Sequence, residues 1–205
     1  MVWTTGPSGV ATGGSTAPIA YERLAAEPFA SRVDWKRVHV WWTDERCVPP
    51  DHEQSNFRMV AAALLDRVQG VEVHRMQGEL GPHDGAAAYE RELEESGPEA
   101  FDLILLGLGP DAHICSLFPS DDALAERERR VVGVETAGMA PLVPRITLTL
   151  PVVNSTRRIV FLITGEDKAE AVARAFSGHP DPRAPGSLVD GSPLVLMDAA
   201  AAARL

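Results

Sequence analysis

Short apolar runs alternate with segments of helical periodicity along most of this chain. The apolar runs predict strands at residues 38–42, 71–76, 101–106, 145–150, 159–164 and 194–197. Apolar residues that recur at helical spacing predict helices at residues 19–26, 57–68, 84–94 and 169–176. Such alternation is typical of βα units. We therefore predict an α/β fold with helices flanking a mainly parallel, Rossmann-like sheet.

The individual segments differ in character. The run at 101–106 is almost continuously apolar, as a strand covered on both faces requires, so we predict it at the centre of the sheet. Residues 2–11 make a poor strand, and the stretch at 179–193, rich in Pro and Gly, predicts a loop. The Ala-rich residues 198–205 predict a terminal helix. Because no repeat or linker is visible, we expect residues 1–205 to form a single domain.

Composition and charge narrow the range of partners. Among 205 residues there are 19 Lys and Arg against 29 Asp and Glu, which gives a formal net charge of −10. Nucleic acids and anionic membranes select clustered basic residues, so we expect neither as a partner, whereas a small anion stays compatible. Only two cysteines, Cys47 and Cys115, and no long apolar segment indicate a cytoplasmic protein. We expect a monomer or a weak homo-oligomer.

Ligands of parallel sheets gather beyond the carboxyl ends of the strands, so loops are the first place to look for a site. In the loop at residues 12–16, Gly13 and Gly14 precede two hydroxyl side chains, Ser15 and Thr16, and a predicted helix. Converging amides at a helix start suit a phosphate. The alternative is a plain glycine turn in which Thr16 caps the helix.

Three basic residues are further candidates for anion binding. Arg46 follows the predicted strand at 38–42, and Asp44 precedes it closely enough to orient it. Arg145 begins another predicted strand, and Lys168 lies just before the predicted helix at 169–176. The alternative for each is a solvated surface charge, which for Arg46 would include a surface ion pair.

The loop after the predicted central strand contains the candidate for catalysis. His113 lies there two positions after Asp111, on a turn that glycines loosen. An imidazole beside a carboxylate can act as a general base near neutral pH, although a lone histidine is more often structural. Cys115 is interpreted as core filler. The other histidines show no metal-ligand spacing, so no metal site is predicted.

Together these segments resemble the 6-phosphogluconolactonase family. The resemblance rests on motifs that occur in the family's order: GGST at 13–16, WTDERCVP at 42–49 with SN at 55–56, FDLILLGLGPDAH at 101–113 with SLFP at 116–119, RIT at 145–147, and Gly165 with KA at 168–169. Glucosamine-6-phosphate deaminases share the sheet and a similar loop, but they continue that loop with Asn-Glu-Pro where this chain has SLFP.

The resemblance implies hydrolysis of 6-phospho-D-glucono-1,5-lactone to 6-phosphogluconate, a step of the pentose phosphate pathway, without metal or cofactor. By that analogy His113 activates a water molecule and Asp111 sets the orientation or charge of the imidazole. The implied residues for holding the phosphate or stabilising the oxyanion are Gly13, Gly14, Ser15, Thr16, Asp44, Arg46, Arg145 and Lys168. The division of these two tasks stays open.

Two features depart from the family pattern. Ala112 stands where members usually carry glycine; if this position needs a positive φ, a methyl group costs on the order of 1 kcal/mol in strain, or more if it obstructs substrate. Members also begin with further residues, including a helix and an apolar strand that leads into the glycine loop. We therefore expect a truncated N terminus, an underfilled sheet position and a less stable chain.

Two alternative functions follow from these observations. One is a sugar-phosphate isomerase or deaminase on the same fold, against which SLFP at 116–119 argues. The other is a non-catalytic module that binds sugar phosphates, which Ala112 and the short N terminus make plausible. The lactonase, the isomerase or deaminase, and the non-catalytic module all require the same thing: His113, the cations and the glycine loop must converge on one cleft.

Overall fold

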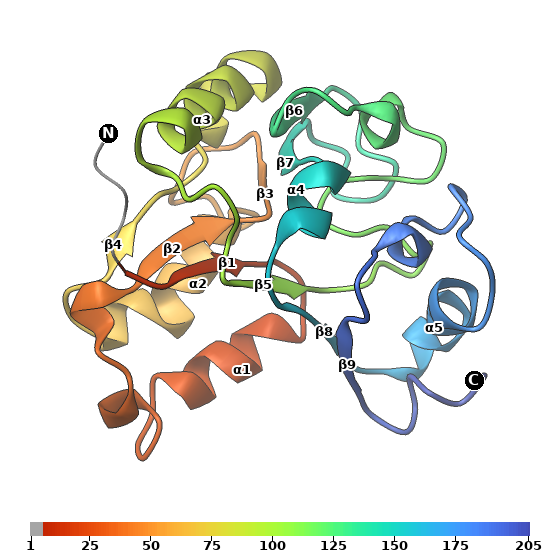
Figure 1. Ribbon diagram of the computed structural model, residues 1–205, viewed down its shortest axis with the longest axis horizontal. Helices are drawn as coiled ribbons and strands as arrows, with labels where there is room; N and C mark the ends of the chain where they lie inside the picture. Colours follow the sequence, from red (N-terminus) through yellow and green to blue (C-terminus); the bar gives the residue numbers. More distant parts are fainter. Residues whose placement is uncertain (1–5) are drawn as a thin grey trace.

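The computed structural model describes residues 6–205, and its main sheet is parallel throughout, with the strand order β4-β2-β1-β5-β8-β9 (Figure 1). The strands are β1 (Ser8–Ala11), β2 (His39–Trp42), β4 (Glu72–Val73), β5 (Leu103–Leu106), β8 (Ile159–Ile163) and β9 (Leu194–Met197). The predicted α/β fold is confirmed, and β5 lies in the middle of the sheet as its apolar run requires.

Helices cover both faces of this sheet. In Figure 1, α1 (Ala17–Leu24) and α2 (Asn56–Ala63) lie below the sheet, and α3 (Pro82–Ser96) and α4 (Leu150–Ser155) lie above it. The remaining helix, α5 (Ala169–Phe176), packs Phe176 edge-on against Phe161 of β8. Within residues 6–205, no helix combines the length and apolarity needed to cross a bilayer.

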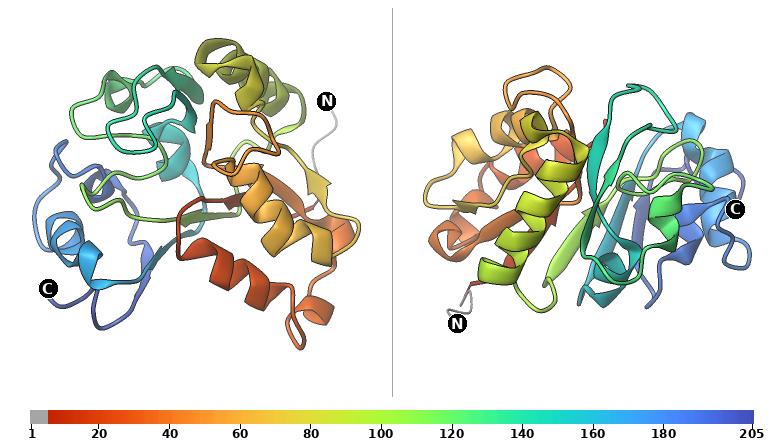
Figure 2. Two further views of the ribbon diagram at one scale, coloured as in Figure 1. Left: turned by 180° about the vertical axis from the view of Figure 1, so that it is seen from behind. Right: turned by 90° about the horizontal axis from the view of Figure 1, so that it is seen from above.

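A small antiparallel sheet stands beside the main one, in the order β3-β7-β6. It consists of β3 (Asp44–Arg46), β7 (Arg145–Leu148) and β6 (Val131–Val134), and β6 and β7 lie next to α3 (Figure 2). Thr43 connects the two sheets, because its N–H donates to Ala11 at 2.9 Å and its carbonyl accepts from Leu148 at 2.8 Å. Two sequence expectations are therefore wrong: residues 44–46 are strand rather than loop, and β7 ends at residue 148 and lies outside the main sheet.

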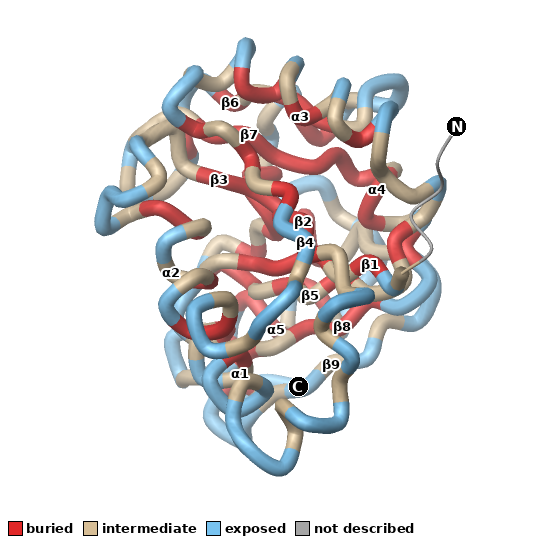
Figure 3. Tube along the Cα trace, turned by 90° about the vertical axis from the view of Figure 1, so that its left-hand side faces the viewer, coloured by how far each residue is buried: buried red, intermediate tan, exposed pale blue. Residues whose placement is uncertain are grey.

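The hydrophobic core extends across both sheets. Figure 3 shows buried backbone running through β2, β3 and β7, and Trp41 and Trp42 at the end of β2 are fully buried. Trp41 packs against Tyr89 of α3, and Trp42 packs against Phe57 of α2. Consecutive residues of a strand point to opposite faces, so the pair anchors one helix on each side of the sheet.

The expectation of an underfilled sheet position is wrong. Within the segment described as a poor strand, Ser8–Ala11 form β1, which pairs with β2 on one side and β5 on the other. The Ser8 N–H and hydroxyl both donate to Asp102, at 2.9 and 3.1 Å. Strand propensity is weak relative to such pairing, so buried neighbours impose the extended form here. Residues 2–5 lie outside the described residues.

Most other predicted segments occur with shifted ends. The strand predicted at 71–76 is reduced to the two residues of β4, and the helix predicted at 57–68 ends at Ala63, followed by a 3-10 turn at Leu65–Arg67. The predicted C-terminal helix is wrong, because residues 199–204 form turns. Asp198 accepts the Gly165 and Ala201 N–H groups there, and so short a segment cannot nucleate a helix without packing.

Candidate active site

The loops after β1, β2, β5 and β8 converge on one cleft of about 200 Å³ at the carboxyl edge of the main sheet. The predicted site residues that line it are Gly13, Gly14, Ser15, Thr16, Asp44, Arg46, His113, Arg145 and Lys168. Asp111 lies behind His113 and contacts its ring. The convergence on which the sequence-based hypotheses depend is therefore present in the structure.

The glycine loop has a conformation that requires glycine at two positions, and it contacts Asn56 and Thr164. Gly14 has a φ of +94°, which side-chain-bearing residues rarely adopt, and a Cβ on Gly13 would lie 2.3 Å from Oδ1 of Asn56. Thr16 precedes α1 without capping it, and its hydroxyl instead lies 2.8 Å from that of Thr164 after β8. This contact brings the glycine loop beside the segment that carries Lys168. The alternative of a plain glycine turn in which Thr16 caps the helix is therefore wrong.

Arg46 and Arg145 face each other in register across β3 and β7. Arg145 is 3% exposed, and its Nε and Nη2 donate to the carbonyls of Val143 and Pro141. Burial, and then the charge of Arg46, lower the pKa of Arg145, although a guanidinium stays protonated. Neither arginine forms an ion pair with any carboxylate of residues 6–205.

The carboxylates of Asp44 and Glu45 lie near enough for their charges to act on Arg145, but neither of them forms an ion pair with the two guanidiniums. Nε of Arg46 is buried without a hydrogen-bond partner in the described part of the chain, while its Nη1 donates to the Gln54 carbonyl at 2.7 Å. Leaving a charged donor unsatisfied is costly, so an incoming anion would gain from both guanidiniums. This arrangement excludes the solvated surface ion pair as the explanation for Arg46.

Two buried carboxylates, those of Asp44 and Glu45, hold together the segments that form this cleft. Asp44 accepts from the hydroxyl of Ser116 at 2.7 Å, which ties the catalytic-loop candidate to β3. Glu45 accepts the N–H groups of Asn56 and Phe57, each at 2.7 Å, and so holds the start of α2. Burial raises the pKa of Glu45 against the opposing effect of these hydrogen bonds. The side chain of Asn56 donates to the carbonyl of Asp44 at 2.9 Å, and this bond holds it against the glycine loop.

His113 and Asp111 form a close pair. Nδ1 of His113 lies 2.6 Å from Oδ1 of Asp111, and the imidazole also packs against Phe118. Burial raises the pKa of Asp111, but hydrogen bonds and charge from His113 outweigh it and bring the pKa below its usual value. An ionised Asp111 assigns the proton to Nδ1. Nε2 of His113 then has a free lone pair, and it makes no hydrogen bond within residues 6–205.

Gly109 makes this pair possible. A Cβ at this position would lie 2.1 Å from Nδ1 of His113 and 2.7 Å from Oδ1 of Asp111, so only glycine leaves room for the hydrogen bond. The Gly109 N–H also donates to the carbonyl of His113 at 2.9 Å, which closes the turn. The glycine-loosened turn noted in the sequence therefore serves to bring the carboxylate and the imidazole together.

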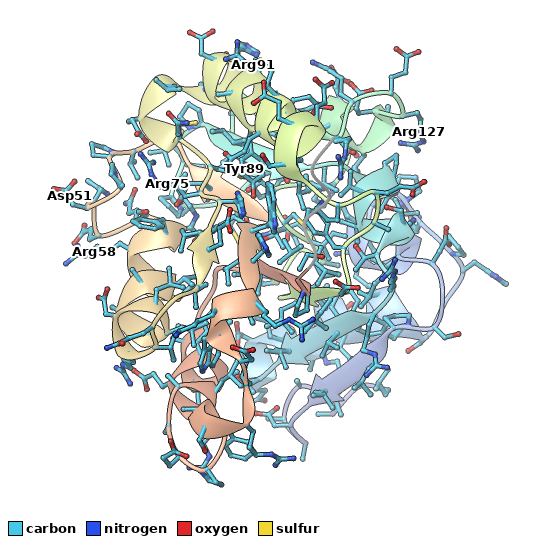
Figure 4. All side chains as sticks on the ribbon, turned by 60° about the vertical axis from the view of Figure 1, so that its left-hand side comes forward. Asp51, Arg58, Arg75, Tyr89, Arg91 and Arg127 are labelled. Atoms are coloured by element: carbon cyan, nitrogen blue, oxygen red, sulfur yellow. The ribbon has the colours of Figure 1, made fainter. Side chains whose placement is uncertain are left out.

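The Asp111–His113 pair should make the free energy of unfolding depend on pH in the acid range. Because the folded-state pKa of Asp111 lies below 3.8, ionised Asp111 stabilises the fold above that pH, and this contribution is lost as the pH falls through the lower folded value. Thermal melts should therefore show Asp111→Asn less stable than the wild type near neutrality, with the gap closing below pH 3.8. Asp51→Asn, at a solvent-facing carboxylate (Figure 4), is the control. A gap that does not change with pH would contradict this account.

Ala112 adopts a φ of +69°, so this position does require the left-handed conformation. Its methyl group is fully buried and belongs to the core rather than to the cleft lining. The Ala112 carbonyl accepts from Gly186 at 2.9 Å, which fixes the loop from behind. The methyl group therefore does not line the cleft, and backbone strain is the effect of this residue that the structure shows.

Ala112→Gly is expected to change stability and activity little. Relief of the left-handed strain gains about 1 kcal/mol, whereas loss of a buried methyl and added freedom of the unfolded chain cost about as much. We expect a Tm within about 3 °C of the wild type and an unchanged kcat/KM. A many-fold rise in kcat/KM would show that the alanine does restrict the substrate.

The two cysteines behave as the sequence indicated. Cys47 and Cys115 are unpaired thiols; burial raises the pKa of Cys47 to about 11, and burial also raises the pKa of Cys115 well above its usual range. Neither thiol is poised as a nucleophile. The sequence reasoning overlooked a different set, namely Asn56 and Ser116 as cleft-lining polar groups, because they were read only as a helix start and as part of a motif.

The fold and the cleft define a class: an α/β protein whose sheet edge is arranged to receive a small anion. The sequence profile of the family described as glucosamine-6-phosphate isomerases/6-phosphogluconolactonase matches residues 8–196. The chain belongs to this family.

Individual relatives agree with this assignment. The 6-phosphogluconolactonase of Streptomyces coelicolor is 40% identical over 96% of this chain and 81% of its own length. That of Mycobacterium tuberculosis is 38% identical over 96% of this chain and 84% of its own length. The crystal structure of 6-phosphogluconolactonase from Thermotoga maritima matches with a TM-score of 0.81 and 32% identity, over 94% of this chain and 84% of the other. A monomeric glucosamine-6-phosphate deaminase shares the fold, with a TM-score of 0.84 at 20% identity over 97% of this chain and 88% of the other.

Proposed function

We propose that this chain hydrolyses 6-phospho-D-glucono-1,5-lactone to 6-phospho-D-gluconate, a hydrolase reaction of carbohydrate metabolism in the pentose phosphate pathway. The observation that carries the proposal is a single cleft in which the unoccupied Nε2 of His113 lies with Arg46, Arg145, Lys168 and a glycine loop. A base and a set of cations are what a phosphorylated lactone needs from the protein. The relatives from Streptomyces coelicolor, Mycobacterium tuberculosis and Thermotoga maritima are named 6-phosphogluconolactonases, which supports the proposal.

In the proposed mechanism, Nε2 of His113 takes a proton from a water molecule as that water attacks the lactone carbonyl. The ionised Asp111 holds Nδ1–H and stabilises the imidazolium that forms. The tetrahedral intermediate then collapses, the ester C–O bond breaks, and the imidazolium returns its proton to the departing ring oxygen. Water is consumed and the ring opens to a carboxylic acid, which releases its proton to solvent and leaves the carboxylate, with no net change in the protein.

We assign the phosphate to the end of the cleft where the glycine loop and Lys168 lie together. The contact between Thr16 and Thr164 supports this, because it brings the amides of the loop beside the start of the segment that carries Lys168. The pair of Arg46 and Arg145 is then left for the developing oxyanion and the product carboxylate. Binding energy from the phosphate would thus hold the carbonyl near His113.

The test is lactone hydrolysis measured above the spontaneous background, together with ammonia release from glucosamine 6-phosphate. Accelerated hydrolysis with no ammonia release supports the proposal. Ammonia release would instead favour the deaminase, and binding of 6-phosphogluconate without accelerated hydrolysis would favour a non-catalytic module. The local feature that favours the lactonase over the deaminase is the sequence SLFP at 116–119, within which the hydroxyl of Ser116 donates to Asp44 at 2.7 Å.

We further propose that the chain acts as a single catalytic domain in the cytoplasm, as a monomer or a weak homo-oligomer, without a cofactor. Two free thiols are compatible with a reducing compartment. The cations that matter gather in one cleft of a protein whose net charge is −10, which fits a small dianionic substrate better than a polyanion.

A further inference from the structure

A cluster of two histidines and one glutamate lies at the opposite edge of the sheet from the cleft. His39 is the first residue of β2, Glu72 is the first residue of β4, and His74 follows β4 directly. Because both strands run toward the cleft, their first residues lie at the far edge, and the β2–β4 register places His39 opposite Glu72. The cluster takes no part in the proposed lactone hydrolysis.

The polar atoms of this cluster point into one common space. Nδ1 of His39 lies 3.1 Å from Nε2 of His74, and the Glu72 carboxylate oxygens lie 3.7 and 3.8 Å from these two nitrogens. In a tetrahedral zinc site with metal–ligand bonds of about 2.0–2.2 Å, neighbouring ligand atoms are about 3.3–3.5 Å apart. The separation of the two histidine nitrogens is within a few tenths of an ångström of that distance, and one ligand atom from each of the three residues lies within 4.8 Å of the other two.

Surrounding groups fix the orientation of His74. Its Nδ1 lies 2.8 Å from the Glu92 carboxylate of α3, and its ring stacks on Trp41 with centroids 3.8 Å apart. A carboxylate that accepts the second ring proton is the usual outer partner of a metal-bound histidine, because it leaves the other nitrogen free to bind. Tyr89, one turn before Glu92, lies between α3 and the sheet, whereas Arg91 points away from it (Figure 4).

The three side chains differ in exposure, and this difference suits a metal ion with an open coordination position. The side chains of His39 and His74 are 12% and 6% exposed, while Glu72 is 63% exposed and leaves access for the ion and a water ligand.

We propose that His39, Glu72 and His74 form a binding site for a divalent transition-metal ion of the zinc type, with Glu92 as the outer partner of His74. Two imidazole nitrogens and a carboxylate oxygen favour Zn²⁺ over Mg²⁺ or Ca²⁺, which prefer oxygen ligands. The bound ion joins β2 to β4, which has only two residues in the sheet and forms its edge. Its role is therefore to hold this edge in place rather than to serve catalysis.

The experiment is a titration of the metal-free full-length chain with Zn²⁺, followed by calorimetry and by thermal melting. At free Zn²⁺ about 100 times the Kd, the Tm should rise by about 5–10 °C. Co²⁺ should give the visible absorption of a four-coordinate complex. Glu72→Gln and His39→Gln should each weaken binding by 10-fold or more, and Glu92→Gln should weaken it by about 10- to 100-fold.

Glu95→Gln is the matched control, because it removes the same charge from an exposed position of α3. Cys47 and His113 are present in every variant, so adventitious binding at either would change none of these comparisons. Circular dichroism of each metal-free variant checks its fold. Equal Zn²⁺ affinity in the wild type, Glu72→Gln and Glu95→Gln would overturn the proposal, as would no heat of binding and no Tm change in the wild type.

Discussion

Replacing His113 with alanine is expected to lower kcat for lactone hydrolysis by about 10²- to 10⁴-fold. The variant loses the free Nε2 that accepts the proton of water, while the cations that bind the substrate remain in the cleft. KM should therefore change far less than kcat, because binding of the phosphate does not pass through the imidazole. The measurement is a steady-state rate corrected for spontaneous hydrolysis of the lactone.

The control for this variant is His179→Ala, which removes an exposed histidine from the loop after α5. It should hydrolyse the lactone at the wild-type rate. Asp111→Asn should lie between the two, since it retains the base but loses the charge that stabilises the imidazolium. Full activity of His113→Ala would remove the proposed base from the mechanism while leaving the reaction itself to be explained by another group.

Arg145→Met is expected to raise the Kd for 6-phosphogluconate by about 10- to 100-fold, the range for loss of a charge-assisted hydrogen bond worth about 1.5–3 kcal/mol. Methionine keeps much of the length of the side chain but none of its charge. Arg145 and Arg46 face each other and form no ion pair within residues 6–205, so the loss of one charge also relieves their repulsion. The fold should consequently survive, and isothermal titration calorimetry gives the affinity.

Arg157→Met is the matched control for this experiment. Arg157 is exposed, pairs with Asp102 at 2.7 Å and precedes β8, so it lies at the amino edge of the sheet, away from the cleft. Its loss should leave the affinity unchanged. If Arg145→Met binds 6-phosphogluconate as tightly as the wild type does, Arg145 serves only to hold the carbonyls of Val143 and Pro141, and the anion must be held elsewhere.

Local patterns predicted the parts of the chain whose structure depends on local periodicity. The stripe at 57–68 correctly indicated α2, and in the structure Ser55 caps this helix by accepting the N–H of Arg58 at 3.2 Å. The continuous apolar run at 101–106 correctly indicated a central strand. Both features depend on neighbours a few residues away along the chain, which is why a sequence pattern can predict them.

Other parts depended on distant partners. Ser8–Ala11 have little strand character alone, but pairing with β2 and β5 makes them a central strand. Asp44–Arg46 resemble a polar loop, yet they pair with β7 and so bring Arg46 opposite Arg145. The sequence contains both arginines but not their register, because register is set by contacts between segments about a hundred residues apart.

By itself, then, the sequence determined the α/β alternation, the motifs of the glycine loop and of Asp111 and His113, and the family to which they point. Only the tertiary structure decided that Arg46 and Arg145 share one cleft with His113, that Ala112 is strained but does not line this cleft, and that His39, Glu72 and His74 meet at the opposite edge. The physical reason is that hydrophobic periodicity acts within a helix or a strand, whereas a binding site is formed by side chains that meet only when the sheet is assembled.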